Sequence, residues 1–152
     1  MQKKLLLGLT LTTCLTAPAA AETWYEVGTT DTEIGYADAD SIQSNGGNVL
    51  LTAFQGFETA QGDSSDIYYA KHRIEIDCSS RQLRELSIDT YDVARTFLGQ
   101  ANFDAGWMTI EPNTFGESYR QVACEGTRPG MAYSDAFAAA DDYWEYMYYY
   151  GD

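Results

Sequence analysis

One long run of alternating apolar and polar residues lies between positions 66 and 78. One side of the alternation carries Tyr68, Ala70, His72, Ile74, Ile76 and Cys78, and the other carries Ile67, Tyr69, Lys71, Arg73, Glu75 and Asp77. A period of two predicts a β-strand with one buried face and one largely solvent-exposed face. We therefore expect this segment to be the central strand of an antiparallel sheet.

Shorter patterns on either side predict the rest of the sheet. Strands are expected at 23–27 and 33–37 as a hairpin, then at 49–57, at 81–91 and, as a short edge strand, at 107–110. The Asn45-Gly46-Gly47-Asn48 segment predicts a turn. Leu83 is out of phase with Leu86 and Ile88, which predicts either a bulge in that strand or a later start of the strand. Residues 38–42 are expected to form a turn or one helical turn, 58–65 a loop, and 93–106 a long loop with a helical turn at 94–98.

The period changes after Pro112. Thr114 and Glu117 have the spacing of a capping box, and an apolar stripe follows at Phe115, Tyr119 and Val122. This pattern predicts a short amphipathic helix that ends at Cys124. Its stripe needs an apolar surface, and the buried face around Cys78 is expected to supply one.

The first 21 residues have the features of a secretory signal peptide. Lys3 and Lys4 precede a short apolar run, and Ala19-Ala-Ala21 forms a small-residue cleavage site. The apolar run is too short to span a bilayer. Cys14 is a weak match to a lipoprotein signal, because Thr13 is larger than the residue expected before such a cysteine. We expect an exported protein that is periplasmic, on the cell surface or secreted, without membrane insertion after signal cleavage.

Two cysteines, Cys78 and Cys124, remain after the predicted cleavage. An even count in an oxidising compartment predicts one disulfide, which would tether the helix to the sheet. The alternative is a pair of free redox thiols, but the chain has no CxxC motif and no basic neighbour that would favour a thiolate.

The charge is strongly acidic. The chain has 9 basic residues against 23 acidic ones and a formal net charge of −14. Such a charge repels nucleic acid and anionic lipid. A net charge of this size either keeps a protein soluble or forms an acidic surface for a basic protein partner.

The end of the chain, 127–152, has a composition of its own, acidic and rich in tyrosine. Ser134 is expected to cap a helix that reaches about Tyr150, with Phe137, Trp144 and Tyr148 on one side as candidate partner-binding residues. This tail either frays or folds back on its own domain, or it docks on a protein partner. Self-association into a homo-oligomer is a further alternative.

Catalytic and metal motifs are missing from the sequence. His72 is the one histidine and is expected to be a hydrogen-bonded core residue; the alternative is a hydrolase that uses it. Asp38 and Asp40, like Asp63 and Asp66, lack the spacing of an EF-hand. We therefore assign no catalytic residue, no cofactor and no metal site.

Several short segments form a pattern in their order and spacing: Trp24, Tyr36-Ala-Asp38 with Ser41-Ile42, Ile76-Asp77-Cys78, the strand from Leu83 to Tyr91, Trp107, Ile110 and Pro112, and the helix that ends at Cys124. Together they resemble the surface-adhesin protein E-like family of bacterial exported proteins. The resemblance covers about residues 23–125. It implies an α+β fold, a small antiparallel sheet with a C-terminal helix disulfide-tethered to one face. The family is named for a member that binds host extracellular-matrix proteins.

These patterns lead to one interpretation. Residues 1–21 are a cleaved signal peptide, 22–126 are an α+β domain of about five or six antiparallel strands, and 127–152 are an acidic tail. The expected function is non-catalytic, adhesin-like binding in the cell envelope or at the cell surface. The alternatives are an envelope assembly subunit that uses its aromatic tail, and the hydrolase.

Overall fold

The computed structural model describes residues 21–63 and 66–151, so the predicted signal peptide up to residue 20 lies outside the described residues. The strands are β1 (Trp24–Thr29), β2 (Glu33–Asn45), β3 (Asn48–Gln61), β4 (Ile67–Asp77), β5 (Gln82–Tyr91), β6 (Phe97–Asn102), β7 (Met108–Thr109) and β8 (Ala132–Tyr133). The helices are α1 (Phe115–Glu125) and α2 (Ala136–Tyr150).

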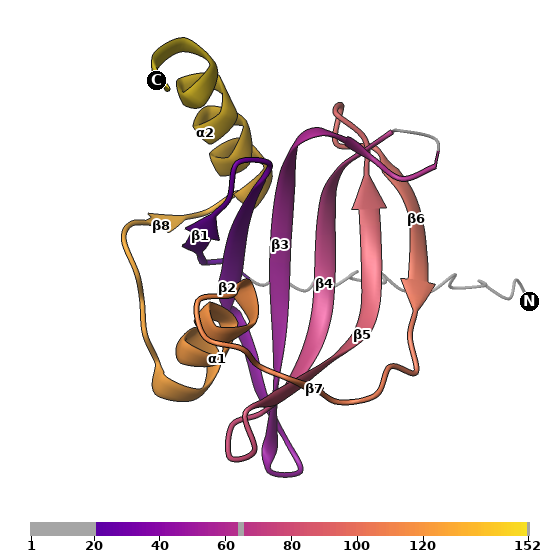
Figure 1. The fold of residues 1–152 in the computed structure, drawn as a ribbon, viewed down its shortest axis with the longest axis vertical. Helices are drawn as coiled ribbons and strands as arrows, with labels where there is room; N and C mark the ends of the chain where they lie inside the picture. Colours follow the sequence, from indigo (N-terminus) through magenta and orange to yellow (C-terminus); the bar gives the residue numbers. More distant parts are fainter. Residues whose placement is uncertain (1–20, 64–65, 152) are drawn as a thin grey trace, which may run out of the picture.

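All eight strands belong to one antiparallel sheet, in the order β6-β5-β4-β3-β2-β1-β8, with β7 paired to the start of β5 (Figure 1). The α+β class is confirmed, and β4 lies in the middle of the sheet as expected. The strand count is higher than predicted because β6 and β8 were not anticipated.

The region around Asp38 is strand and not the expected turn. β2 continues to Asn45, with an irregularity in its pairing to β3 between Asp38 and Gln43. The Asp38 carboxylate accepts hydrogen bonds from the backbone N–H groups of Thr23 and Asp40, and the Ser41 hydroxyl donates to the Asp38 carbonyl. These side chains satisfy backbone groups where the ladder is broken, as in a bulge.

The helical turn expected at 94–98 is also wrong. Tyr91 and Phe97 are paired across a tight connection, in which the Asp92 carboxylate accepts from the Thr96 N–H and Arg95 has a φ of 63°. This turn leads into β6, which forms one edge of the sheet.

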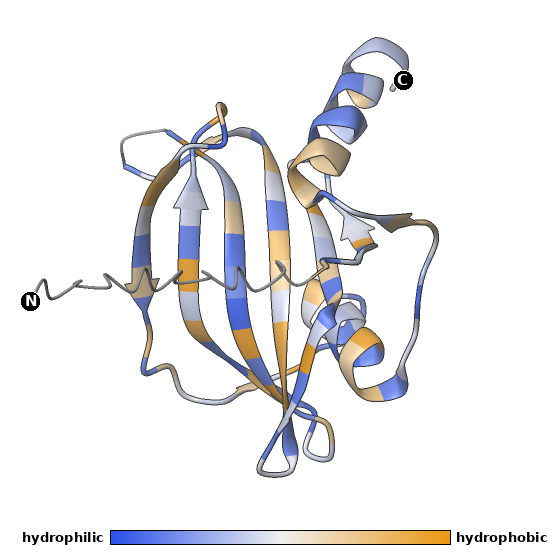
Figure 2. Cartoon of the chain, turned by 180° about the vertical axis from the view of Figure 1, so that it is seen from behind, coloured by the Kyte–Doolittle hydropathy of each residue, from blue (hydrophilic) through white to orange (hydrophobic). Residues whose placement is uncertain are grey.

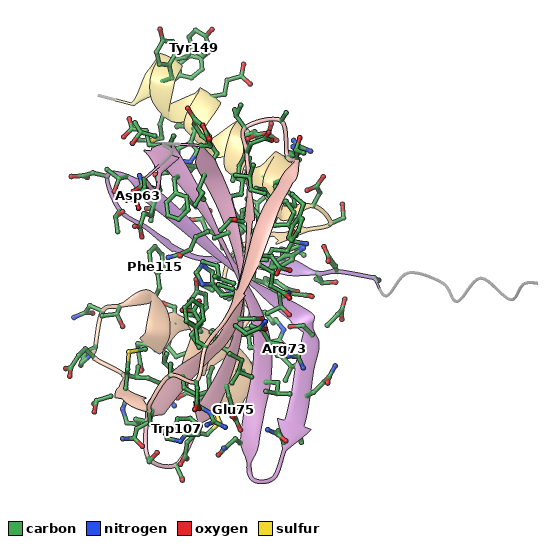
Figure 3. The ribbon with its side chains drawn as sticks, turned by 90° about the vertical axis from the view of Figure 1, so that its right-hand side faces the viewer. Asp63, Arg73, Glu75, Trp107, Phe115 and Tyr149 are labelled. Carbon is green, nitrogen blue, oxygen red and sulfur yellow. A yellow bond between two sulfur atoms is a disulfide. The ribbon has the colours of Figure 1, made fainter. Side chains whose placement is uncertain are left out.

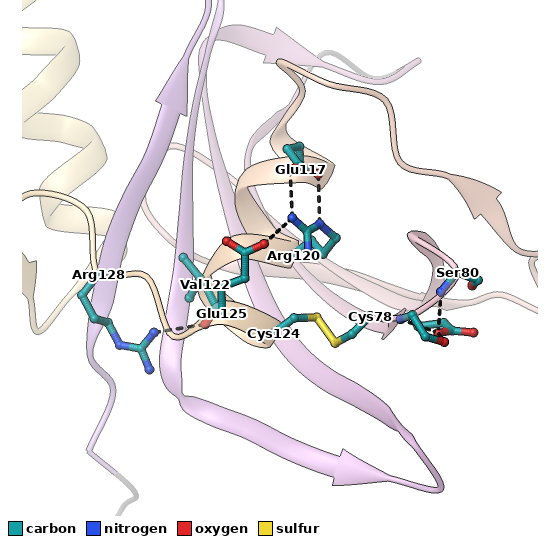
Figure 4. The surroundings of a disulfide bond; sticks show 10 residues. Cys78, Ser80, Glu117, Arg120, Val122, Cys124, Glu125 and Arg128 are labelled. Carbon is teal, nitrogen blue, oxygen red and sulfur yellow. Dashed lines mark hydrogen bonds and ion pairs between the residues drawn. A yellow bond between two sulfur atoms is a disulfide. The ribbon is translucent and has the colours of Figure 1, made fainter.

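Helix α1 begins and ends nearly as predicted. The Thr114 side chain accepts a hydrogen bond from the Glu117 N–H, and Gly126 closes the helix in the left-handed conformation. The predicted disulfide joins Cys78, just after β4, to Cys124, with a Cα–Cα distance of 5.8 Å (Figure 4). Helix and sheet are therefore covalently tethered.

A helix covers each face of the sheet (Figures 1 and 3). The core under α1 consists of Val27, Ala37, Leu51, Ala53, Ile74, Ile76, Ile110, Tyr119 and Val122. The core under α2 consists of Trp24, Ile34, Tyr36, Phe54, Tyr69, Ala136, Ala139 and Ala140. The second face of β4 was expected to be largely exposed, yet Tyr69 and Glu75 on it are buried.

Helix α2 starts one residue later than expected. Its N-cap is Asp135, not Ser134, and the Asp135 carboxylate accepts from the N–H groups of Phe137 and Ala138. Figure 2 shows apolar colours on the first turn of α2 and more polar colours towards its end, which extends past the sheet. The tail therefore adds β8 to the sheet, covers its second face and then projects beyond it.

Candidate functional site

The single histidine, His72 of β4, pairs with a carboxylate on the neighbouring strand. His72 Nδ1 lies 2.5 Å from Glu85 Oε1, and the two side chains are 17% and 27% exposed. The register between β4 and β5 shifts between Arg73 and Ile74, because Leu86 is an extra residue in β5. This bulge places Glu85 on the same face as His72, so the phase break seen in the sequence has a structural consequence.

The pair faces a cavity of about 210 Å³ between α1 and the sheet. The cavity is lined by Gln55, His72, Ile74, Leu83, Glu85, Met108, Gly116 and Tyr119. Met108, on the short strand β7, is 52% exposed and marks the side that reaches solvent. The groups of the lining that could take part in acid–base or covalent chemistry are His72, Glu85 and Tyr119.

Two buried polar atoms of this lining, His72 Nε2 and the Tyr119 hydroxyl, have no hydrogen-bond partner within the described residues. Tyr119 is only 7% exposed. A buried polar group without a partner costs roughly 1–3 kcal/mol. Burial raises the pKa of the Tyr119 phenol, with a smaller contribution from the charge of Glu33, so the hydroxyl stays protonated.

Gly116 has no side chain, which allows α1 to pack close to Leu83 at the cavity wall. A Cβ at this position of α1 would lie 2.9 Å from Leu83 Cδ2. A glycine in the first helical turn lowers helix propensity by about 1 kcal/mol, and the close approach of Leu83 gives it a packing reason.

The carboxylates of Asp38 and Asp40 form hydrogen bonds within the fold. Asp38 is 6% exposed and bonded to backbone N–H groups; burial raises its pKa, and those hydrogen bonds partly offset the shift. The Asp40 carboxylate accepts from the Thr23 hydroxyl. Among the described residues, no three His, Cys, Asp or Glu side chains are grouped so that they could hold a metal ion.

The three candidate partner-binding residues of α2 lie in different environments. Phe137 packs in the second core against Phe54, and Trp144 is half-buried beside Tyr143. Tyr148 is 84% exposed and lies near the helix end, next to Tyr149, which Figure 3 labels at the tip. The exposed part of this surface is therefore the last two turns of α2, which we call the α2 tip (residues 145–150).

Sequence reasoning found His72 but missed the polar residues that line the cavity with it. Glu85 and Gln55 are ordinary strand residues, and Tyr119 was assigned to the apolar stripe of the helix. The signal that was available is the phase break at Leu83, because a bulge reverses the face of the residues on one side of it.

The fold defines a class of small α+β proteins in which one antiparallel sheet carries a disulfide-tethered helix. The model of the surface-adhesin protein E family matches residues 24–125. The chain belongs to this family, as its sequence patterns indicated. Among curated proteins, none matches the chain.

Solved structures that resemble this chain include three of Haemophilus influenzae protein E. One is 15% identical, has a TM-score of 0.48 and covers 80% of this chain and 96% of its own. Crystal form II is 14% identical, with a TM-score of 0.47 over 78% of this chain and 98% of its own. The protein from the non-typeable bacterium is 15% identical, with a TM-score of 0.45 over 91% and 96%.

Within residues 21–63 and 66–151, no helix is both long and apolar enough to cross a membrane. The longest helix, α2, has 15 residues and carries Asp141, Asp142 and Glu145.

Proposed function

We propose that this chain is a small exported binding protein of the bacterial cell envelope or surface, acting without catalysis. Membership of the surface-adhesin protein E family is the observation that carries the proposal. The predicted signal peptide and the disulfide support an oxidising compartment outside the cytoplasm.

The α2 tip is the surface that we assign to a protein partner. Tyr146, Tyr148, Tyr149 and Tyr150 are all more than half exposed. Tyrosines supply large contact areas at interfaces. Helix α2 contains no basic residue, and Asp142 and Glu145 lie beside these rings. Charge complementarity therefore favours a basic partner.

The experiment compares capture of basic extracellular-matrix proteins by immobilised, oxidised protein and by a chain that ends at Glu145. The shortened chain keeps Phe137, Ala139 and Ala140 in the second core, so it retains the fold. We expect capture by the full chain to fall at least tenfold in the shortened chain. The Met131→Ala variant, which changes an exposed residue away from the tip, is the matched control and should bind normally.

If neither the full chain nor the shortened chain captures a protein, that result would contradict a binding role. Equal capture by both chains would retain the binding role but place it elsewhere on the surface.

Export has its own test. Expression of the full chain in a Gram-negative host, followed by N-terminal sequencing of the periplasmic fraction, should give a mature protein that begins at Glu22. Retention of the intact N-terminus in the cytoplasm would contradict export.

The second candidate function is assembly, and the exposed edge strand β6 favours it. Phe97 and Leu98 on β6 and Phe103 just after it are 54%, 45% and 42% exposed. An apolar edge strand with free backbone groups is a template for pairing with another chain. Light scattering of the wild type, of Leu98→Lys and of the chain ending at Glu145 separates edge pairing from association through the α2 tip.

A further inference from the structure

The cavity under α1 has both polar and apolar lining residues. Its polar lining consists of His72, Glu85, Tyr119 and Gln55, whereas Ile74, Leu83 and Met108 supply apolar walls. Specific sites for small molecules have this composition, with a few polar groups that orient an otherwise apolar ligand.

The two unpartnered atoms define the hydrogen bonds that a ligand would make. His72 Nδ1 faces the Glu85 carboxylate and is assigned as the donor to it, which leaves Nε2 as the ring nitrogen available to a ligand. The Tyr119 hydroxyl is protonated and is free to donate. A ligand hydroxyl satisfies both atoms at once, because it donates to one and accepts from the other.

Charge and size limit the ligand further. Glu85 lines the cavity, and the Glu33 carboxylate lies 3.5 Å from Gln55 Nε2, so an anionic ligand would meet like charges. A cavity of about 150 Å³ is sufficient for benzene. The volume of about 210 Å³ found under α1 therefore accepts one substituted ring.

We propose that the cavity between α1 and strands β4 and β5 binds a small neutral phenol, whose hydroxyl bridges His72 Nε2 and the Tyr119 hydroxyl. The ring lies against Ile74 and Leu83, and entry is past Met108. This site is on the opposite face of the sheet from the core that anchors α2, so it is independent of the binding role proposed for the α2 tip.

The test uses p-cresol as the probe, with toluene and 4-methylbenzoate as matched compounds that lack the hydroxyl or carry a negative charge. The chain has a single histidine, so the imidazole ¹⁵N signals in an NMR titration report on His72 alone. We expect p-cresol to shift the Nε2 signal and to bind about tenfold more tightly than toluene. The benzoate should bind more weakly than either.

The Tyr119→Phe variant removes the hydroxyl at nearly constant volume and breaks no hydrogen bond of the described residues. It should lose the preference for p-cresol over toluene and keep its toluene affinity. Tyr148→Phe, at an exposed tyrosine, is the control and should retain the preference. Gly116→Ala, whose Cβ would approach Leu83, should weaken binding of both compounds.

Three results would overturn the proposal. They are equal affinities of the wild type for p-cresol and toluene, tighter binding of 4-methylbenzoate than of p-cresol, and the absence of any shift at His72 with all three compounds. The last result would mean that the cavity holds water only.

Discussion

Glu75 is a buried carboxylate on β4, on the face away from α1. It is 3% exposed, and its oxygens accept hydrogen bonds from Asn45, Asn48 and Arg84. The hydrogen bond from Asn48 is the largest cause that lowers its pKa; burial acts in the opposite direction, and the Arg84 hydrogen bond and charge lower the pKa further. These three hydrogen-bond donors explain how the Glu75 charge is buried on the face of β4 that the sequence pattern predicted to be exposed to solvent.

We predict that Glu75→Gln lowers the free energy of unfolding at pH 7 by about 2 kcal/mol, because Arg84 loses its charged partner. The folded-state pKa of Glu75 is depressed, so its stabilisation is present above the unfolded value of about 4.3 and is lost as the pH falls through the folded value. Urea unfolding at several pH values should therefore show the wild type and variant converging in acid. Glu58→Gln, at an exposed carboxylate, should track the wild type; a constant gap for Glu75→Gln would contradict the linkage.

At the scale of the elements, α2 is held on the sheet by aromatic contacts and by one close approach. The Phe137 ring lies 4.9 Å from that of Phe54 and 5.1 Å from that of Tyr69, measured between centroids. The Tyr69 hydroxyl also donates to Asp141. At Gly56 of β3, a Cβ would come within 2.7 Å of the Ala140 Cβ.

Substitution of Gly56 by alanine should therefore lift α2 from the sheet. We expect a loss of about 1–3 kcal/mol in unfolding free energy, and chemical-shift changes at Phe137 and Ala140 that do not extend to α1. The matched control is Gly99→Ala in β6, where a Cβ would meet nothing within 4 Å. Equal effects at the two glycines would show that strand propensity, and not the contact with Ala140, is responsible.

The elements that could be predicted from the sequence are those with strong local signals. β4 has a clean alternation, and α1 has its Thr114 cap and a stripe ending at Cys124. β6 was missed because Phe97 and Leu98 are adjacent, and both are exposed in the fold. β8 contains only two residues and exists because it pairs with Trp24 and Tyr25. The cavity could not be predicted, since it depends on how far α1 stands from β4 and β5.

For the molecule as a whole, the disulfide and the second core contribute in different ways. Cys78 and Cys124 are 46 residues apart in sequence, and the crosslink shortens the unfolded chain across β5, β6, β7 and α1. Around the crosslink, Arg120 pairs with Glu117 and Glu125, and Arg128 donates to the Val122 carbonyl (Figure 4).

Removal of the crosslink in Cys78→Ser/Cys124→Ser should lower the unfolding free energy by about 4 kcal/mol, chiefly by increasing the entropy of the unfolded chain. Urea unfolding of the oxidised wild type, the reduced wild type and the double variant measures this. Equal stability of the oxidised and reduced wild type would contradict the role of the tether.

The place at which the tail is cut should decide whether the domain survives. A chain that ends at Gly130 loses β8 and all of α2 and uncovers Trp24, Tyr36 and Phe54, which are buried. We predict that it is destabilised by several kcal/mol, whereas the chain that ends at Glu145 unfolds within about 1 kcal/mol of the wild type. Near-ultraviolet circular dichroism with urea unfolding distinguishes the two; equal stability would show that 131–145 is dispensable to the fold.

The two edges of the sheet are unlike. β8, a strand of two residues that leads straight into α2, borders β1, while β6 leaves a six-residue edge on the other side. Copies that join through β6 can only do so by presenting the same edge to one another, which generates a two-fold axis and consumes the one long edge of each. Growth then stops at two subunits, so the asymmetry of the sheet protects this acidic protein from open-ended fibre formation.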